Sequence, residues 1–176
     1  MVKIALVNVV VTASLNQEMD FEELRRFGEI FHDSDVYGGR VAYFKTKGMQ
    51  GRVSIFSSGK MISVGTKSEE QAQKELQLAK RFLAEKSPIK EVALEPKTQN
   101  IVDTTDFEQQ VNLEELAQKT RAIYEPEQFP GAILRLQQPF KTSILVFASG
   151  KVVITGLKDS KRIETVVERI KELIVE

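Results

Sequence analysis

The side chains best suited to contact another molecule are amides and lysines that recur at matching places in the two halves of the chain. Asn8 and Asn100 each lie within an apolar run, and each amide offers two N–H donors and a carbonyl acceptor. Lys60 and Lys67 both recur as lysines 91 residues later. Amides suit hydrogen bonding to a polar surface, and lysines suit contact with phosphates. The recurring residues therefore favour binding over covalent chemistry.

Residues that commonly catalyse reactions are scarce. The chain has no cysteine and a single histidine, His32, so thiolate sites and multi-histidine metal sites are excluded. It contains no glycine-rich phosphate loop, no HExxH pair and no nucleophile elbow. The glutamate pairs at 22–23 and 114–115 fall in predicted first turns of helices, where the helix dipole explains them. We expect no enzymatic activity, no metal and no cofactor.

The composition is that of a globular protein with two electrostatically different halves. Of 176 residues, 41% are hydrophobic and 28% are charged, and no apolar run approaches the roughly 20 residues of a membrane span. We interpret the apolar N-terminus as a strand and not as a signal peptide. Residues 1–90 hold 14 basic and 11 acidic side chains, and residues 91–176 hold 11 and 14, so the net charges are +3 and −3. The two halves can therefore meet partners of different charge.

The chain is an internal duplication. Three separate segments recur in one order at offsets of 91 or 92 residues, namely Val7–Val10 with Gln99–Val102, Asp20–Leu24 with Asn112–Leu116, and Ile55–Lys60 with Val146–Lys151. Such agreement is hard to obtain by chance. We therefore divide the chain into a first repeat, residues 1–90, and a second repeat, residues 91–176. The linker around residues 87–88 is short, so the repeats are expected to form one continuous pseudo-twofold domain.

Both repeats predict the same strands. Alternating or apolar runs place them at 3–12, 36–44, 52–57 and 60–66 in the first repeat and at 97–104, 129–136, 143–147 and 151–156 in the second. Ser57-Ser-Gly59 and Ala148-Ser-Gly150 predict tight hairpin turns between the last two strands of each repeat. Strands mixed with helices in this order indicate an α+β protein with an antiparallel sheet.

Capping residues predict two helices in each repeat. Asp20 and Asn112 each precede a glutamate by three residues, which is the capping-box spacing. Ser68 and Asp159 precede longer amphipathic runs that close each repeat. Their apolar stripes are Ala72, Leu76, Ala79 and Leu83 in the first repeat and Ile163, Val166, Val167, Ile170, Leu173 and Ile174 in the second.

The predicted strands are apolar on both faces. In 143–147, Ile144 and Val146 lie on one face while Leu145 and Phe147 lie on the other. The helices can cover only one face, so the second is either buried in a sandwich or dimer or binds a ligand. This second face also carries the two central asparagines and a rim of lysines. Such a surface suits a DNA minor groove, whose floor offers acceptors and whose edges carry phosphates.

Three motifs make the chain resemble the TATA-box-binding protein family in its short archaeal form. They are Tyr124-Glu-Pro-Glu-Gln-Phe-Pro-Gly131, Gln99-Asn-Ile-Val102 and Phe147-Ala-Ser-Gly-Lys151. The resemblance covers the whole chain and is closer in the second repeat. It implies a saddle in which a curved antiparallel sheet of about ten strands carries four helices on its convex face.

The resemblance also implies a function. Members of the family act as general transcription initiation factors, which bind and bend A/T-rich, double-stranded promoter DNA through the minor groove. They recruit transcription factor B and, indirectly, RNA polymerase. The implied setting is the cytoplasm of an archaeal cell, at the nucleoid and away from any membrane. Without DNA, the protein could pair as a homodimer.

Carried over residue by residue, the resemblance implies two pairs of aromatic wedges at the ends of the DNA site. They match Phe129 with Phe147 in the second repeat, and Tyr37 with Phe56 in the first. The other implied DNA contacts are Asn8, Val10, Lys60, Ile62, Val64, Lys67, Gln99, Asn100, Val102, Arg135, Leu145, Lys151, Val153, Thr155 and Lys158. Glu125 and Glu127 are the implied contacts with transcription factor B.

The first repeat departs from the family pattern. Tyr37 replaces a wedge phenylalanine, and Val64 replaces a groove-contacting threonine. Arg52, Ser54 and, in the second repeat, Ser143 stand where the family is apolar or small. We therefore expect a weaker kink under the first repeat and a lower affinity than is usual in the family. The alternative is a divergent paralogue that binds DNA weakly and acts mainly through protein contacts.

Overall fold

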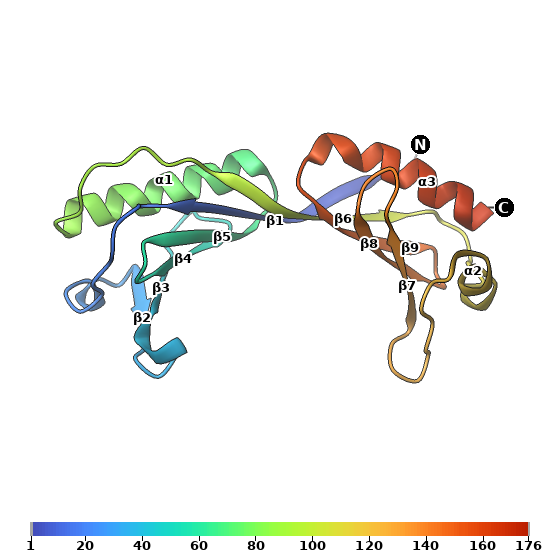
Figure 1. Ribbon diagram of the computed structural model, residues 1–176, viewed down its shortest axis with the longest axis horizontal. Coiled ribbons are helices and arrows are strands. Elements are labelled where there is room, and N and C mark those ends of the chain that lie inside the picture. Colours follow the sequence, from blue (N-terminus) through green and yellow to red (C-terminus); the bar gives the residue numbers. More distant parts are fainter. Residues whose placement is uncertain (1, 176) are drawn as a thin grey trace. The chain divides into compact units, whose positions relative to one another are not determined.

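The computed structural model describes residues 2–175, which form two compact units (Figure 1). The first unit holds residues 8–99, and the second unit holds residues up to Val7 together with the chain from Asn100 onward. The boundaries of these units fall inside two long strands. The strand that begins at Ile4 starts in the second unit and continues in the first, and the strand that begins at Lys97 starts in the first unit and continues in the second.

The strands of the described chain form a sheet of nine in the order β2-β3-β4-β5-β1-β6-β9-β8-β7. Their bounds are β1 Ile4–Ser14, β2 Ile30–His32, β3 Val41–Phe44, β4 Arg52–Phe56, β5 Lys60–Thr66, β6 Lys97–Asp106, β7 Gly131–Leu136, β8 Thr142–Phe147 and β9 Lys151–Leu157. Within residues 2–175 the α-helices are α1 Glu69–Lys86, α2 Leu113–Thr120 and α3 Ile163–Val175. The predicted α+β class and antiparallel sheet are confirmed.

The short helix predicted after Asp20 is not an α-helix. Asp20 Oδ1 accepts a hydrogen bond from the Glu22 N–H at 3.0 Å, which closes a turn, and only a 3₁₀ helix, Leu24–Arg26, follows. The backbone leaves helical geometry at Phe27 and soon enters β2, which was not predicted. The edge strand takes the residues that a longer helix would need, so residues 2–175 contain three α-helices where four were expected.

The corresponding segment of the second repeat behaves differently. Asn112 Oδ1 accepts from the Glu115 N–H at 3.1 Å and caps α2 as predicted. In place of an edge strand, Ile123 forms only an isolated bridge with Ile133. The described sheet therefore has nine strands, and the position of a tenth is reduced to this bridge.

The two closing helices cover one face of the strands in their own units, as the predicted stripes require. Ser68 Oγ accepts from the Gln71 N–H at 3.0 Å and caps α1, whose residues Ala72, Leu76, Ala79 and Leu83 are fully buried. In α3, Val166, Val167 and Ile170 are buried. Alternate strand residues lie beneath them, including Val53, Ile55 and Met61 in the first unit and Ile144, Val146 and Ile154 in the second.

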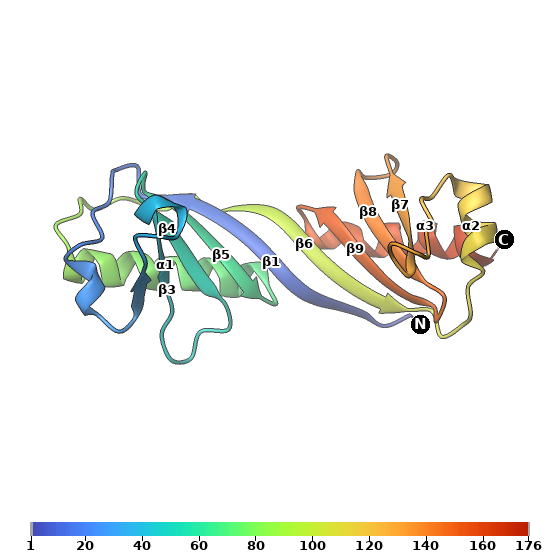
Figure 2. The same cartoon turned by 90° about the horizontal axis from the view of Figure 1, so that it is seen from below.

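The opposite face of each unit is left uncovered by helices, and we call it the open face. Figure 2 shows it in front of α1 in the first unit and in front of α3 in the second. Its half-buried residues are Val10, Thr12, Ser54, Phe56, Ile62 and Val64 in the first unit and Val102, Thr104, Leu145, Phe147, Val153 and Thr155 in the second. The second apolar face predicted from the sequence is therefore present in each unit.

A buried carboxylate fixes the loop that leads into β4. Glu75 of α1 is 1% exposed, and its Oε1 accepts from the backbone N–H of Gln50 at 2.7 Å. Its Oε2 lies 3.2 Å from the Gly51 nitrogen, and the Gln71 side-chain amide donates to Oε1 at 3.1 Å. A Cβ at Gly51 would collide with the Val64 carbonyl. Helix, loop and strand are thus locked together where β4 begins.

Candidate nucleic-acid interface

A β-bulge orients the amide of Asn8 on the open face of the first unit. The pairing of β1 with β5 shifts register between Val9 and Val11, so that Val64 and Gly65 of β5 both lie opposite Val10. Gly65 has a φ of +94°. The N–H of Gly65 donates to Asn8 Oδ1 at 2.8 Å. Because the carbonyl end of the amide is occupied, its NH₂ end is the available one. Within residues 2–175 that NH₂ group has no hydrogen-bond partner.

The second unit repeats this arrangement and adds a second partner. The N–H of Gly156, whose φ is +104°, donates to Asn100 Oδ1 at 2.8 Å. The hydroxyl of Thr155 lies 3.1 Å from Asn100 Nδ2 and 3.2 Å from Oδ1. Val64 stands at the place of Thr155 in the first unit and has no hydroxyl. Asn100 is therefore held more firmly than Asn8.

Phe129 and Phe147 come together on the second unit. Their ring centroids lie 5.8 Å apart with an interplanar angle of 60°, and both side chains are half-buried. Gly131 pairs with Phe147 across the sheet, and a Cβ there would lie 2.9 Å from Phe129 Cε1 and 3.2 Å from Phe147 Cε1. The Phe-Pro-Gly motif thus ends in the one residue that leaves room for the ring pair.

The first unit does not bring Tyr37 and Phe56 together as a pair. Tyr37 is 75% exposed, has a φ of +49° and makes no aromatic contact within the described chain. Phe56 pairs across the sheet with Val41, so a branched side chain occupies the place that Gly131 leaves empty in the second unit. The two wedge positions implied for the first repeat are therefore separated.

The cations implied by the resemblance lie at the ends of strands and are exposed; they are Lys60, Lys67, Arg135, Lys151 and Lys158. The remaining implied apolar contacts, Val10, Ile62, Val102, Leu145 and Val153, lie on the open faces. Gln99 is exposed, and its side chain donates to Thr12 Oγ1 at 2.9 Å. Within residues 2–175 none of these five cations forms an ion pair with an acid, which fits a surface for an anionic ligand.

Glu125 and Glu127 are exposed in the turn that precedes the ring pair. The backbone carbonyl of Glu125 accepts from the N–H groups of Gln128 and Phe129, each at 2.9 Å. The backbone of this turn therefore presents Phe129, while the two carboxylates remain at the surface for another partner.

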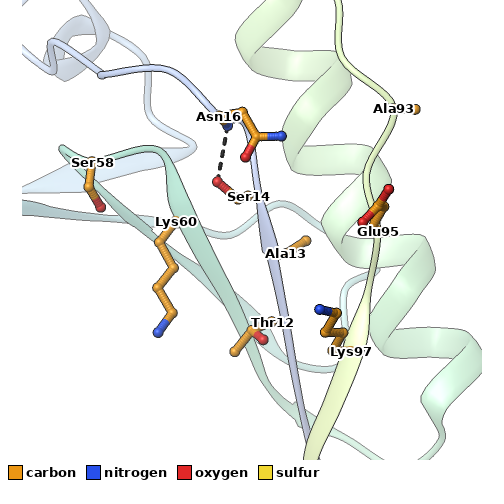
Figure 3. A pocket seen from close by; sticks show the side chains of 9 residues that line it. All are labelled: Thr12, Ala13, Ser14, Asn16, Ser58, Lys60, Ala93, Glu95 and Lys97. Atoms are coloured by element: carbon orange, nitrogen blue, oxygen red, sulfur yellow. Dashed lines mark hydrogen bonds between the residues drawn. The ribbon is translucent and has the colours of Figure 1, made fainter.

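Lys60 also lines a pocket of about 380 Å³ in the first unit (Figure 3). The pocket lies between the end of β1, the start of β5 and the segment that leads into β6; Glu95 of that segment and Lys97, the first residue of β6, line it. Its polar groups partly satisfy one another, since the Asn16 N–H donates to Ser14 Oγ at 3.0 Å.

An aromatic and cationic stack in the first unit was not predicted. The guanidinium carbon of Arg52 lies 4.4 Å from the centroid of the Tyr43 ring, and that ring stacks on Phe31 at 6.3 Å and 24°. No local sequence pattern predicts this stack, because it depends on how β2, β3 and β4 pair with one another. Phe31 lies in β2, which the sequence did not predict.

Across residues 2–175, no group of three or more His, Cys, Asp or Glu side chains is placed to hold a metal ion. None of the helices described is both long and apolar enough to cross a membrane.

The chain matches known proteins over nearly its whole length. The family model described as transcription factor TFIID (or TATA-binding protein, TBP) matches residues 3–86 and again residues 95–176, which confirms the duplication. The TATA-box-binding protein of Cenarchaeum symbiosum is 40% identical over 87% of this chain and 84% of its own length. That of Methanococcus aeolicus is 34% identical over 99% of this chain and 95% of its own length.

A solved structure agrees with these matches. The structure described as Methanococcus jannaschii TBP superimposes with a TM-score of 0.85 at 32% identity and covers 98% of both chains. The family consists of transcription factors and not of enzymes, in agreement with the prediction. By sequence, by fold and by its two matching repeats, the chain belongs to the TATA-binding protein family.

Proposed function

We propose that this protein is a general transcription initiation factor that binds A/T-rich, double-stranded promoter DNA through the minor groove. The observation that carries the proposal is the repeated asparagine and glycine arrangement on the open faces. Each bulge glycine occupies the carbonyl of its asparagine at 2.8 Å. The NH₂ group of Asn8 then remains available, and that of Asn100, which donates one N–H to Thr155 Oγ1 at 3.1 Å, keeps a second N–H for a ligand. Asn8 and Asn100 are thereby prepared to donate and not to accept.

This orientation carries a base preference. The floor of the minor groove offers acceptors at A·T pairs, and a G·C pair adds an N–H donor there. An amide that presents its NH₂ end gains a hydrogen bond at A·T and meets a donor at G·C. The exposed lysines at the strand ends can contact the flanking phosphates, whose contribution does not depend on sequence.

The ring pair of the second unit supports bending of the DNA. Apolar side chains that insert between base steps unstack them at a cost of a few kcal/mol per step, which the extra contacts of the bent duplex recover. Phe129 and Phe147 lie side by side at 5.8 Å and are kept half-exposed by Gly131. Tyr37 and Phe56 are not paired in this way, so we expect the weaker kink under the first repeat.

The separation of Tyr37 from Phe56 also favours the second candidate. A divergent paralogue with weak DNA binding, acting mainly through protein contacts, would need no wedge pair in the first repeat. The two candidates differ in one measurable property, which is affinity for an A/T-rich duplex.

A gel-shift or fluorescence-anisotropy titration separates the candidates. We expect the protein to bind a TATA-containing duplex at least about a hundredfold more tightly than a G·C-rich duplex of equal length at the same salt concentration, because loss of specific contacts typically costs 10³ or more. Similar weak binding to both duplexes would leave the paralogue as the better description. The salt concentration must be held fixed, since phosphate contacts make every affinity salt-dependent.

Recruitment of transcription factor B and, through it, RNA polymerase at the nucleoid completes the proposal. Glu125 and Glu127 are exposed beside the wedge pair, and residues 91–176 carry a net charge of −3, so a basic surface of transcription factor B suits this turn. Pairing of two free copies through their open faces is a further expectation, since it would cover the apolar residues there.

Reversing both charges, Glu125→Lys with Glu127→Lys, is expected to weaken ternary complex formation with transcription factor B about tenfold or more. Both side chains are exposed and form no ion pair within residues 2–175, so DNA binding should change little. Glu108→Lys with Glu114→Lys, in the same repeat, provides a charge-matched control. The measurement is a supershift of the protein–DNA complex by transcription factor B. Equal loss of binary and ternary binding would contradict the assignment.

A further inference from the structure

The stack of Arg52, Tyr43 and Phe31 lies on the open face of the first unit. Phe31 pairs with Tyr43, Tyr43 with Ser54, and Ser54 with Ile62, and directly paired residues share a face. Arg52 itself pairs with Val64, which also belongs to the open face. The guanidinium 4.4 Å above Tyr43 therefore rests over the same surface that Asn8 occupies.

Among its described residues, the second unit has no counterpart of this stack. The matching row runs from Ile123 through Ile133 and Leu145 to Val153, and all of its side chains are aliphatic. Ser143, which pairs with Thr155, takes the place of Arg52. The small Ser54 replaces Leu145 and leaves the Tyr43 ring uncovered, so that the arginine can fold over it. The stack is thus a joint property of several first-unit residues.

Two features suit Arg52 to recognise an anionic or acceptor-rich partner. Within the described chain its guanidinium forms no ion pair, so its charge is not neutralised by the protein. The start of β4 is fixed by Glu75 through Gln50 and Gly51, and the Tyr43 face holds the far end of the side chain. A stacked guanidinium keeps the N–H groups at its edge free, and little rotamer entropy remains to be lost on binding.

We infer that Arg52 reads the minor groove under the first unit and gives this half of the protein a preference for A-tract DNA. This inference rests on the proposed function. A-tracts have a narrow minor groove with enhanced negative potential, which attracts an inserted arginine. Position favours the groove floor over a phosphate, because Arg52 pairs with Val64 on the open face and its guanidinium lies over Tyr43 of the same face. Arg52 also supplies N–H donors beside Val64, where the second unit has Thr155.

The test compares Arg52→Ala with wild type on two self-complementary duplexes, one with an A-tract in each half and one with alternating T and A. Symmetric duplexes present the same half-site to both units, so the binding orientation does not affect the result. We expect Arg52→Ala to lose about tenfold in affinity for the A-tract duplex and less than about twofold for the alternating one. Arg52→Lys should not restore the preference, and Tyr43→Leu should reproduce part of the loss.

Two matched variants distinguish a groove contact by Arg52 from a phosphate contact and from no contact with DNA. Lys60→Ala, at the rim, should weaken binding to both duplexes equally and lower the slope of log affinity against log salt by about 0.9. Arg81→Ala, an exposed arginine of α1, should change neither. If Arg52→Ala weakens binding to both duplexes equally, as Lys60→Ala does, Arg52 contacts a phosphate and the inference is wrong. If Arg52→Ala changes the affinity for neither duplex, as Arg81→Ala does, Arg52 contacts no DNA and the inference is also wrong. Failure of the wild type to bind either duplex would instead overturn the proposed function itself.

Discussion

Replacing Phe129 and Phe147 together with alanine is expected to weaken binding to a TATA duplex by roughly 3 kcal/mol, or more than a hundredfold. The rings lie 5.8 Å apart on the open face, and insertion at a base step is the contact that the alanines remove. The bend angle, measured by energy transfer between dyes at the duplex ends, should fall with the affinity.

Phe56→Ala serves as the comparison for this double variant, because Phe56 lies at the matching place in the first unit without a ring partner. Its effect on bending should be smaller. The double variant should stay folded, because both rings are only half-buried; it loses the aromatic pair, worth about 1 kcal/mol, together with the partial burial of the two rings. A large drop in Tm with an unchanged bend angle would show that the two rings serve the core of the second unit and not the DNA.

Asp103→Asn is expected to raise the free energy of unfolding by about 3 kcal/mol at pH 8 and by almost nothing below pH 4. Asp103 is 2% exposed on the helix-covered face of β6, and its Oδ2 has no partner within residues 2–175. Burial raises the pKa of this carboxyl from 3.8 to about 6. The folded state therefore holds a proton that the unfolded state has released, and stability falls as pH rises from about 4 to about 6.

Urea unfolding at several pH values measures this effect. Asn has nearly the same shape as Asp and cannot ionise, so the variant should lack the fall in stability across that interval. Asp106→Asn is a matched control on the same strand, because Asp106 is half-exposed and its Oδ1 accepts from the Glu108 N–H at 2.9 Å. A gain of equal size at every pH would mean that ionisation of Asp103 is not the cause.

Local sequence patterns predicted the elements that are stabilised by interactions between residues close together in the sequence. The capping hydroxyl of Ser68, the amide of Asn112 and the stripe from Ala72 to Leu83 act through neighbours three or four positions away. The hairpin glycines belong to the same class. Gly59 and Gly150 have φ values of +85° and +90° in the turns between neighbouring strands, a conformation that few other residues adopt.

Features that depend on distant partners could not be predicted in this way. Asp20 has the spacing of a helix cap, but β2 competes for the residues that follow it, and only its pairing with β3 decides the outcome. The bulge glycines orient Asn8 and Asn100 from strands more than 50 positions away. The place of Arg52 over Tyr43 likewise follows from strand register and from the small size of Ser54.

The exchange of strand ends between the two units bears on whether one repeat can stand alone. Residues up to Val7 of β1 belong with the second unit, and residues 97–99 of β6 belong with the first. A peptide made of one repeat alone would keep its long leading strand but lose the neighbour beside it, and an unpaired edge of this length is an aggregation hazard.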